Sequence, residues 1–361
     1  MPTTKKLVQA HDLTFGPREI ETVSQVIFDR VYNESDLTDY HDIETGVDTD
    51  TQIVFAKRMA LLGKEAGINC EPSEAEGFTF TQKMWTPVTE DFRLKHCQAD
   101  MPALARVFRK AQRMNPDFYD AVGSKEFGIV IAGVEASLVE NIHRKVWFND
   151  KDADYTAEGG VFKANTDLDY FNSFDGLFKQ IMTSTSSQDD DKVTLVPIDK
   201  NGAASYTAQA NLGADYAIDI FEKMLLAADE RLLAADDAFI LATRSLAENY
   251  RATLRNKNLG AGFLEVVEEG RPKLYFDGIE IKVRYDWDRY IKTYQDSGTK
   301  WNLPHRAVFT TKSNIPVGTL NEQDLAKLDV FYDRTAKMNI IDAAYTLDAK
   351  LLENYMMVAA Y

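Results

Sequence analysis

Two carboxylates in the segment RYDWDRY are the residues whose type and spacing come nearest to a catalytic pair. Asp286 and Asp288 are separated by one residue, and paired carboxylates act as general acid and base when their separation in space suits the reaction. The segment also predicts strand alternation, which would turn both carboxylates to solvent beside Arg284 and Arg289 as ordinary ion pairs. A soluble hydrolase using Asp286 and Asp288 therefore stays open as one hypothesis.

The sequence offers little other chemistry. It contains no GxGxxG, Walker loop, HExxH or GxSxG motif. Its five histidines are scattered, and His143, with no neighbouring nucleophile in sequence, is interpreted as a packed or surface residue. Cys70 and Cys97 lack the CxxC spacing of a zinc site, and Asp48 and Asp50 lack the glycine and closing glutamate of a calcium loop. We expect no catalytic residue, no cofactor and no metal.

Composition narrows the class of protein. The 361 residues are 45% hydrophobic and 27% charged, which is typical of a folded globular chain, and the length predicts two or three lobes. The net charge of −16 argues against sequence-specific nucleic-acid binding. No stretch is long and apolar enough to span a membrane, and no signal peptide is recognisable, so we expect a soluble chain without a membrane partner.

The most helical segment should position the rest of the molecule. Apolar residues at helical spacing, among them Ile129, Val139, Ile142 and Val146, predict a helix of roughly 25 residues that could serve as a lengthwise strut. Its polar face should carry Arg144 and Lys145. Downstream, residues 214–256 predict a helix–strand–helix order, and two alternating strands follow with turns at Glu269-Gly270 and Asp277-Gly278.

An extended excursion precedes that helix. Residues 64–97 combine glycine and proline punctuation with alternating segments, which predicts a long two-stranded ribbon. Because an isolated ribbon is marginally stable in water, its apolar side chains need a surface to cover them. That surface is either the ribbon's own domain or a neighbouring subunit, and we take these as candidate interface residues: Phe78, Phe80, Met84 and Trp85.

The C-terminal segment stays apolar and aromatic through Tyr361. Terminal residues that pack in this way are tied into a structure, so we expect Tyr355–Tyr361 to be buried and their deletion to impair folding.

The order of these parts resembles tailed-bacteriophage major capsid proteins of the Hong Kong 97 fold, which encapsulins share. The most specific local likenesses are YFDGIEIKVRYDWD, AVFTTKSNIPVGTL and the closing VFYDRTAKMNIIDAAYTLDAKLLENYMMVAAY. The resemblance covers nearly the whole chain and implies an α+β fold. It implies five parts: an N-terminal arm (1–45), a strand and extended E-loop (46–97), a P-domain with the spine helix (98–174), an A-domain (175–324) and C-terminal strands returning to the P-domain (325–361).

The resemblance also implies a function. The chain would be a structural protein, not an enzyme, that self-assembles into the hexamers and pentamers of an icosahedral shell around double-stranded DNA. Further partners would be scaffold, portal and decoration proteins, with DNA touched only non-specifically at the inner surface, in a virion made in the host bacterial cytoplasm. Lys64 and Lys83 lie in the expected loop, but no surrounding pattern identifies a cross-linking lysine. An encapsulin-like cargo shell is the nearest alternative.

Overall fold

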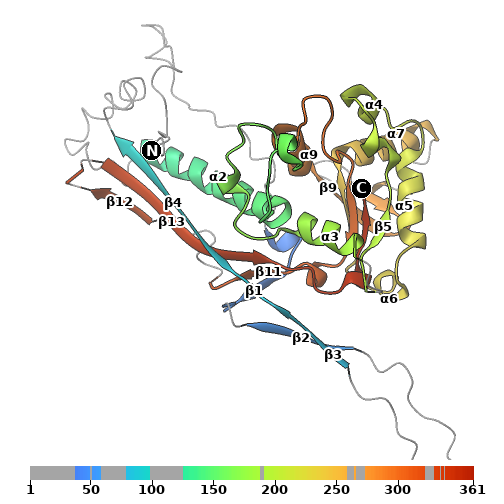
Figure 1. The fold of residues 1–361 in the computed structure, drawn as a ribbon, viewed down its shortest axis with the longest axis horizontal. Helices are drawn as coiled ribbons and strands as arrows, with labels where there is room; N and C mark the ends of the chain where they lie inside the picture. The colour runs from blue at the N-terminus through green and yellow to red at the C-terminus, as the bar shows by residue number, and fades with distance from the viewer. Residues whose placement is uncertain are drawn as a thin grey trace, which may run out of the picture.

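The computed structural model describes residues 37–48, 51–57, 79–97, 125–187, 191–257, 264–265, 273–321, 329–333, 335–336 and 338–361. These residues form two large sheets, a two-stranded ribbon and the helices that pack around them (Figure 1).

The longest strand, β13 (Met338–Ala349), is the centre of a five-stranded sheet. It runs antiparallel to β4 (Val88–Cys97), in register from Met338 opposite Cys97 to Leu347 opposite Val88. It also pairs antiparallel with β12 (Asp329–Asp333) and β11 (Val317–Thr319), and β1 (Ile43–Thr45) extends the sheet by pairing parallel with β11. A strand near residue 90 and one near residue 340 are thus joined along their length.

Helix α2 (Lys125–Phe148) lies lengthwise beside this sheet, as Figure 1 shows. The predicted long helix is confirmed, and the apolar positions expected near its C-terminal end, Ile142 and Val146, are buried. Its last two turns are buried on every side, because residues 149–176 fold back over this end and hydrogen-bond to it, for instance at the Tyr170 carbonyl, which accepts from the Arg144 guanidinium.

One expectation for this helix is wrong. Arg144 and Lys145 do not face solvent: they are 7% and 6% exposed. Both are paired instead, as buried charges must be. Lys145 forms an ion pair with Glu90 of β4, and the Arg144 guanidinium lies 4.7 Å from the centre of the Phe171 ring. Helical periodicity shows which side chains can share a face, but it does not show how many faces other elements cover.

The second sheet has seven strands in the order β5-β14-β10-β6-β9-β8-β7. In that order they span Thr194–Val196, Val358–Ala360, Ala307–Thr310, Phe239–Thr243, Ile279–Arg284, Lys273–Phe276 and Leu264–Glu265. The surrounding helices are α3 (Leu177–Thr185), α4 (Tyr206–Ala210), α5 (Tyr216–Leu226), α6 (Glu230–Leu233), α7 (Arg244–Asn256) and α9 (Tyr285–Tyr294). The predicted helix–strand–helix order of residues 214–256 is confirmed.

Each face of this sheet has its own core. On β6, Phe239 and Leu241 join a core with α2, α3 and α9, whereas Ile240 and Ala242 join a second core with α5 and α7. A strand covered on both faces has no need for polar alternation, which explains the continuous apolar run from Phe239 to Ala242. The sheet is therefore the middle layer of three.

The turn predicted between β8 and β9 is confirmed. Asp277 and Gly278 have φ values of 48° and 82°, and positive φ at both central residues is what a two-residue hairpin turn requires. The turn expected at Glu269-Gly270 lies outside the described residues.

Asp286 and Asp288 do not lie on a strand, so the predicted alternation is wrong at this point. β9 ends at Arg284, and both aspartates belong to the first turn of α9. Acidic residues stabilise the first turn of a helix, because they face its unpaired N–H groups.

Candidate subunit interface

The ribbon that projects from the molecule consists of β2 (Gln52–Lys57) and β3 (Thr79–Met84) (Figure 1). The strands are antiparallel, with Gln52 opposite Met84, Ile53 opposite Lys83 and Val54 opposite Gln82. Because successive side chains alternate between faces, Val54 and Met84 lie on one face, together with Gln52 and Gln82. This outward face of the ribbon exposes 59% of Val54 and 45% of Met84.

Trp85 fixes the point at which the ribbon joins the body. It is 2% exposed, and its backbone N–H donates to the Thr51 carbonyl. Its ring packs on Gly318 of β11 so closely that a Cβ on that glycine would lie 2.7 Å from a ring carbon. Glycine in a strand commonly marks such a close approach. The ring is therefore held inside the subunit.

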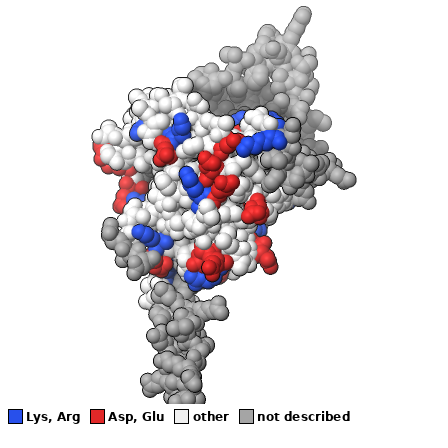
Figure 2. Space-filling model, turned by 90° about the vertical axis from the view of Figure 1, so that its right-hand side faces the viewer, with Lys and Arg blue, Asp and Glu red and all other residues white. Residues whose placement is uncertain are grey.

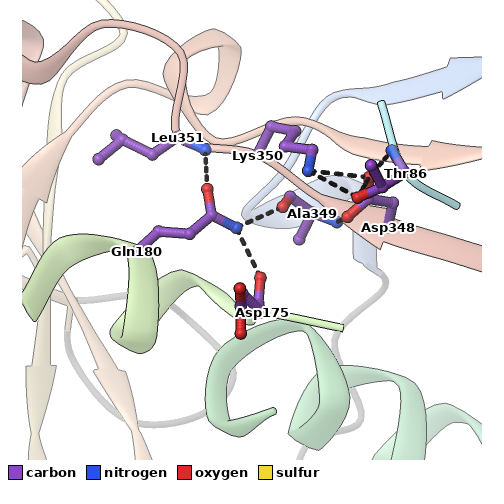
Figure 3. Close-up of polar contacts among 7 residues, drawn as sticks. All are labelled: Thr86, Asp175, Gln180, Asp348, Ala349, Lys350 and Leu351. Carbon is purple, nitrogen blue, oxygen red and sulfur yellow. Dashed lines mark hydrogen bonds and ion pairs between the residues drawn. The ribbon is translucent and has the colours of Figure 1, made fainter. Parts of the chain in front are cut away.

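Next to Trp85, a buried carboxylate binds the chain between β3 and β4. Asp348 is fully buried, and its Oδ2 atom accepts a hydrogen bond from the Thr86 N–H at 2.7 Å. Lys350 balances the charge, with its Nζ atom 3.3 Å from Oδ2 and 3.0 Å from the Thr86 hydroxyl oxygen (Figure 3). A carboxylate that accepts from a backbone N–H and pairs with a lysine makes a strong, directional contact.

Gln180 of α3 extends this network to the helical layer. Its side-chain nitrogen donates to the carbonyls of Asp175 and Ala349, and its side-chain oxygen accepts from the Leu351 N–H (Figure 3). On the ribbon itself, the Lys83 Nζ atom donates to the Leu351 carbonyl at 2.7 Å, and burial lowers the pKa of this lysine. We call Lys83, Trp85, Thr86, Asp348 and Lys350 the ribbon root.

The predicted interface residues differ in exposure on the two sides of the ribbon root. Phe78 lies outside the described residues, and Phe80 lies on β3, although its side chain is not among those described. Met84 is exposed on the outward face. Trp85 presents no surface to a neighbour, because β11 covers it, and its role is corrected to that of an anchor. In the sequence, a glycine at position 318 within a strand was the signal available for the contact with Trp85. No local sequence pattern marks Asp348 or Gln180 as part of the ribbon root network.

Asp286 and Asp288, the candidate catalytic pair of the hydrolase hypothesis, do not form a carboxylate pair that is open to a substrate. Asp286 is 1% exposed and makes two hydrogen bonds with Arg284, at 2.9 and 2.6 Å. Asp288 accepts from the Arg244 backbone N–H at 2.7 Å, and burial raises its pKa to about 6. Arg289, expected beside these aspartates, pairs with Glu140 of α2 instead. The two carboxylates therefore have separate structural partners.

Other site classes find no support in the described part of the chain. No group of three or more His, Cys, Asp or Glu residues there is placed to hold a metal ion. Among the same residues, no helix is both long and apolar enough to cross a membrane. On the face drawn in Figure 2, acidic and basic side chains are interspersed, and the coloured residues form no continuous basic area for a polyanion.

Comparison with known proteins then identifies the architecture. No protein-family model matches the chain, and no curated protein matches it. A solved chain of Mycobacterium phage Ogopogo matches 96% of this chain and 99% of its own length, with 10% identity and a TM-score of 0.50. The capsid of cyanophage P-SCSP1u matches with 12% identity, 94% and 91% coverage and a TM-score of 0.49. The capsid of a native GTA particle gives 13% identity, 93% and 91% coverage and a TM-score of 0.49.

The chain has the Hong Kong 97 capsid fold. The expected α+β fold class is confirmed, since the match to the Ogopogo chain spans nearly all of both chains. At 10% identity this likeness concerns the fold.

Proposed function

We propose that the chain is the major capsid subunit of a tailed phage, which self-assembles into the hexamers and pentamers of an icosahedral shell around double-stranded DNA. The carrying observation is the projecting ribbon, whose root is anchored by buried Trp85 and Asp348 and whose outward face exposes Val54 and Met84. Exposed apolar side chains on a marginally stable two-stranded element favour contact with another surface. Rings of subunits tied by such elements gain strength from many modest contacts rather than from one tight patch.

The parts of the fold then take these roles. Residues 1–45 form the arm, 46–97 the strand and E-loop, 98–174 the P-domain, 175–324 the A-domain and 325–361 the closing strands. The inner surface meets DNA only non-specifically, in keeping with a net charge of −16. Scaffold, portal and decoration proteins are further partners, and the subunit is made in the host bacterial cytoplasm before it enters the virion.

The preorganised root supports this role of the ribbon. An element that is already held in its binding orientation loses less conformational entropy when it docks. Lys83, Thr86 and Asp348 fix the base of the ribbon before any neighbour arrives. The outward face then meets each neighbour at a defined angle, as a closed shell requires.

The test compares assembly with stability. The double variant Val54→Ser and Met84→Ser should lower the yield of shells at least tenfold in sedimentation and negative-stain microscopy, while its urea midpoint stays that of the parent chain. The matched control is Leu226→Ser, because Leu226 is 87% exposed on α5. Full assembly of the double variant, or an equal loss in the control, would reject the ribbon as the contact.

The parent chain tests the shell itself. Purified native particles should contain DNA, whereas a protein cargo would favour an encapsulin-like compartment. Uniform monomers under every assembly condition, together with no shells in cells, would exclude both kinds of shell.

A further inference from the structure

The segment of residues 37–48 is a short strap across the body of the subunit. It comprises the 3-10 helix η3 (Leu37–Asp39) and strand β1, and it links residues 1–36 to the rest of the chain. Three hydrogen bonds join its second half to β11: the Val317 N–H donates to Asp42, and the Gly46 and Val47 N–H groups donate to Leu320 and Thr319. The strap is thus held along one line of backbone contacts.

Side chains of the body hold the first half of the strap. Lys282 of β9 donates to the Asp39 carbonyl, and Lys312 donates to the Thr38 carbonyl, each at 2.9 Å. Between these two lysines, His41 points into the body and is 1% exposed. The strap therefore has exposed lysine contacts at its edge and one buried histidine at its centre.

The hydrogen bonds of His41 fit one protonation state. Its Nδ1 atom lies 2.8 Å from the Ile315 carbonyl oxygen, which can only accept, so Nδ1 carries the proton. Its Nε2 atom lies 3.2 Å from the Trp147 indole nitrogen, which can only donate, so Nε2 must be the acceptor. The neutral ring satisfies both contacts. A second proton, on Nε2, would make Nε2 a donor that faces the indole N–H donor of Trp147.

The surroundings of His41 also oppose a positive charge. Arg284 of β9, His143 of α2 and Lys312 after β10 all lower the pKa of His41, although burial is the largest cause and the bond to Ile315 acts in the opposite direction. The buried carboxylate Asp286 is held by two hydrogen bonds to Arg284. No carboxylate is among the groups that shift the pKa of His41.

We propose that residues 37–48 form a latch that neutral His41 closes and that protonation of its Nε2 atom opens. In the open state the ring leaves Trp147 and Ile315 and is hydrated, so the strap leaves the body with it. This latch goes beyond the proposed shell function, because it opens and closes within one subunit and does not require assembly.

The pH dependence of latch closure has a definite sign. His41 has a lower pKa in the closed latch than in the open one, where it returns to about 6.5. The closed latch is therefore most stable above pH 6.5 and weakens as the pH falls toward the pKa of the closed state. Across that window, the population of the open latch should rise up to tenfold for each pH unit.

Hydrogen exchange of the free subunit tests the latch without any assembly. After correction for intrinsic rates, the Gly46 and Val47 amides should open at least tenfold more often at pH 5.0 than at pH 7.5. The amides of the β8–β9 hairpin serve as the internal control and should change little. Asp288 titrates in the same window, but its raised pKa makes acid stabilising, so it cannot mimic the effect.

Two variants assign the effect to one ring. His41→Asn keeps a donor near Ile315 and should open more at neutral pH, with no further change on acidification. His143→Asn removes a neighbouring buried histidine and should keep the full acid response. The proposal fails if the parent chain shows no acid opening at Gly46 and Val47, or if His143→Asn abolishes that opening while His41→Asn keeps it. None of these results depends on shell formation.

Discussion

At the scale of single residues, Asp286 and Asp288 show how one short motif yields two opposite environments. Asp286 is buried against the guanidinium of Arg284, whereas Asp288 is partly buried with a backbone N–H as its partner. From the sequence we expected both aspartates to form ion pairs with arginines on a solvent-exposed strand, whereas they lie in the first turn of α9. Burial of this kind depends on α2 and α9 packing on the sheet, which no local pattern encodes.

Matched substitutions of these aspartates should have opposite signs. Asp286→Asn removes the charge that neutralises buried Arg284, so the free energy of unfolding should fall by about 3–5 kcal/mol. Asp288→Asn keeps an acceptor for the Arg244 N–H but removes a charge that burial disfavours. Since the pKa of Asp288 is raised to about 6, its ionisation costs stability above that pH, and the variant should gain about 1–3 kcal/mol at pH 7.5.

Urea denaturation of the subunit at pH 7.5 and pH 4.5 measures both effects. The gain from Asp288→Asn should shrink at pH 4.5, where the parent carboxyl is largely protonated. A loss of stability from Asp288→Asn at pH 7.5, or a neutral Asp286→Asn, would contradict this account of the site. If the two aspartates were a catalytic pair instead, both variants would stay stable but lose an enzymatic activity.

At the scale of elements, the long helix follows from local pattern, but the ribbon does so only in part. β3 lies within the predicted residues 64–97, whereas its partner β2 precedes them and β4 joins the five-stranded sheet instead. Alternation and turn residues near Phe80 predicted a two-stranded excursion, and 3.6-residue periodicity predicted α2. Nothing near Trp85 indicated that β11 would cover its ring. Contacts between segments far apart in sequence depend on register and close approach, and Gly318 was the one residue that signalled such an approach.

Gly318→Ala should loosen the ribbon root. Its Cβ would lie 2.7 Å from the Trp85 ring, and a buried ring can give way only by shifting its neighbours, so we expect a loss of about 1–3 kcal/mol. The control is Gly202→Ala, because a Cβ at Gly202 meets nothing within 4 Å, and it should change stability by less than about 0.5 kcal/mol. Denaturation followed by tryptophan fluorescence makes the comparison, and equal effects would refute the close contact.

At the scale of the whole molecule, the α+β fold class was predictable because the order of parts is distinctive, whereas the connection between the two sheets was not. The closing residues were expected to return to the P-domain as strands, and β13 lies in the five-stranded sheet. β14, however, lies between β5 and β10 in the seven-stranded sheet. The small, fully buried Ala359 and Ala360 fit a central strand, but their sequence does not specify which sheet receives them.

Deletion of residues 355–361 should therefore prevent folding of the subunit rather than only its assembly. The deletion removes a central strand, exposes the edges of β5 and β10, and removes the contact of the Tyr361 hydroxyl with Thr185. Circular dichroism and thermal melting of the truncated chain should show no cooperative transition. A truncated chain that melts cooperatively but forms no shells would place this segment at the interface instead.

The position of β14 also sets an order of events during synthesis. β5 is complete at Val196, but its neighbour in the sheet begins only at Val358, so residues 197–357 must be made in between. At ordinary translation rates that interval lasts roughly 10–30 s. Once β10 has been made, its edge and the edge of β5 both lack their partner until β14 is synthesised. Until β14 is made, the subunit cannot complete its seven-stranded sheet.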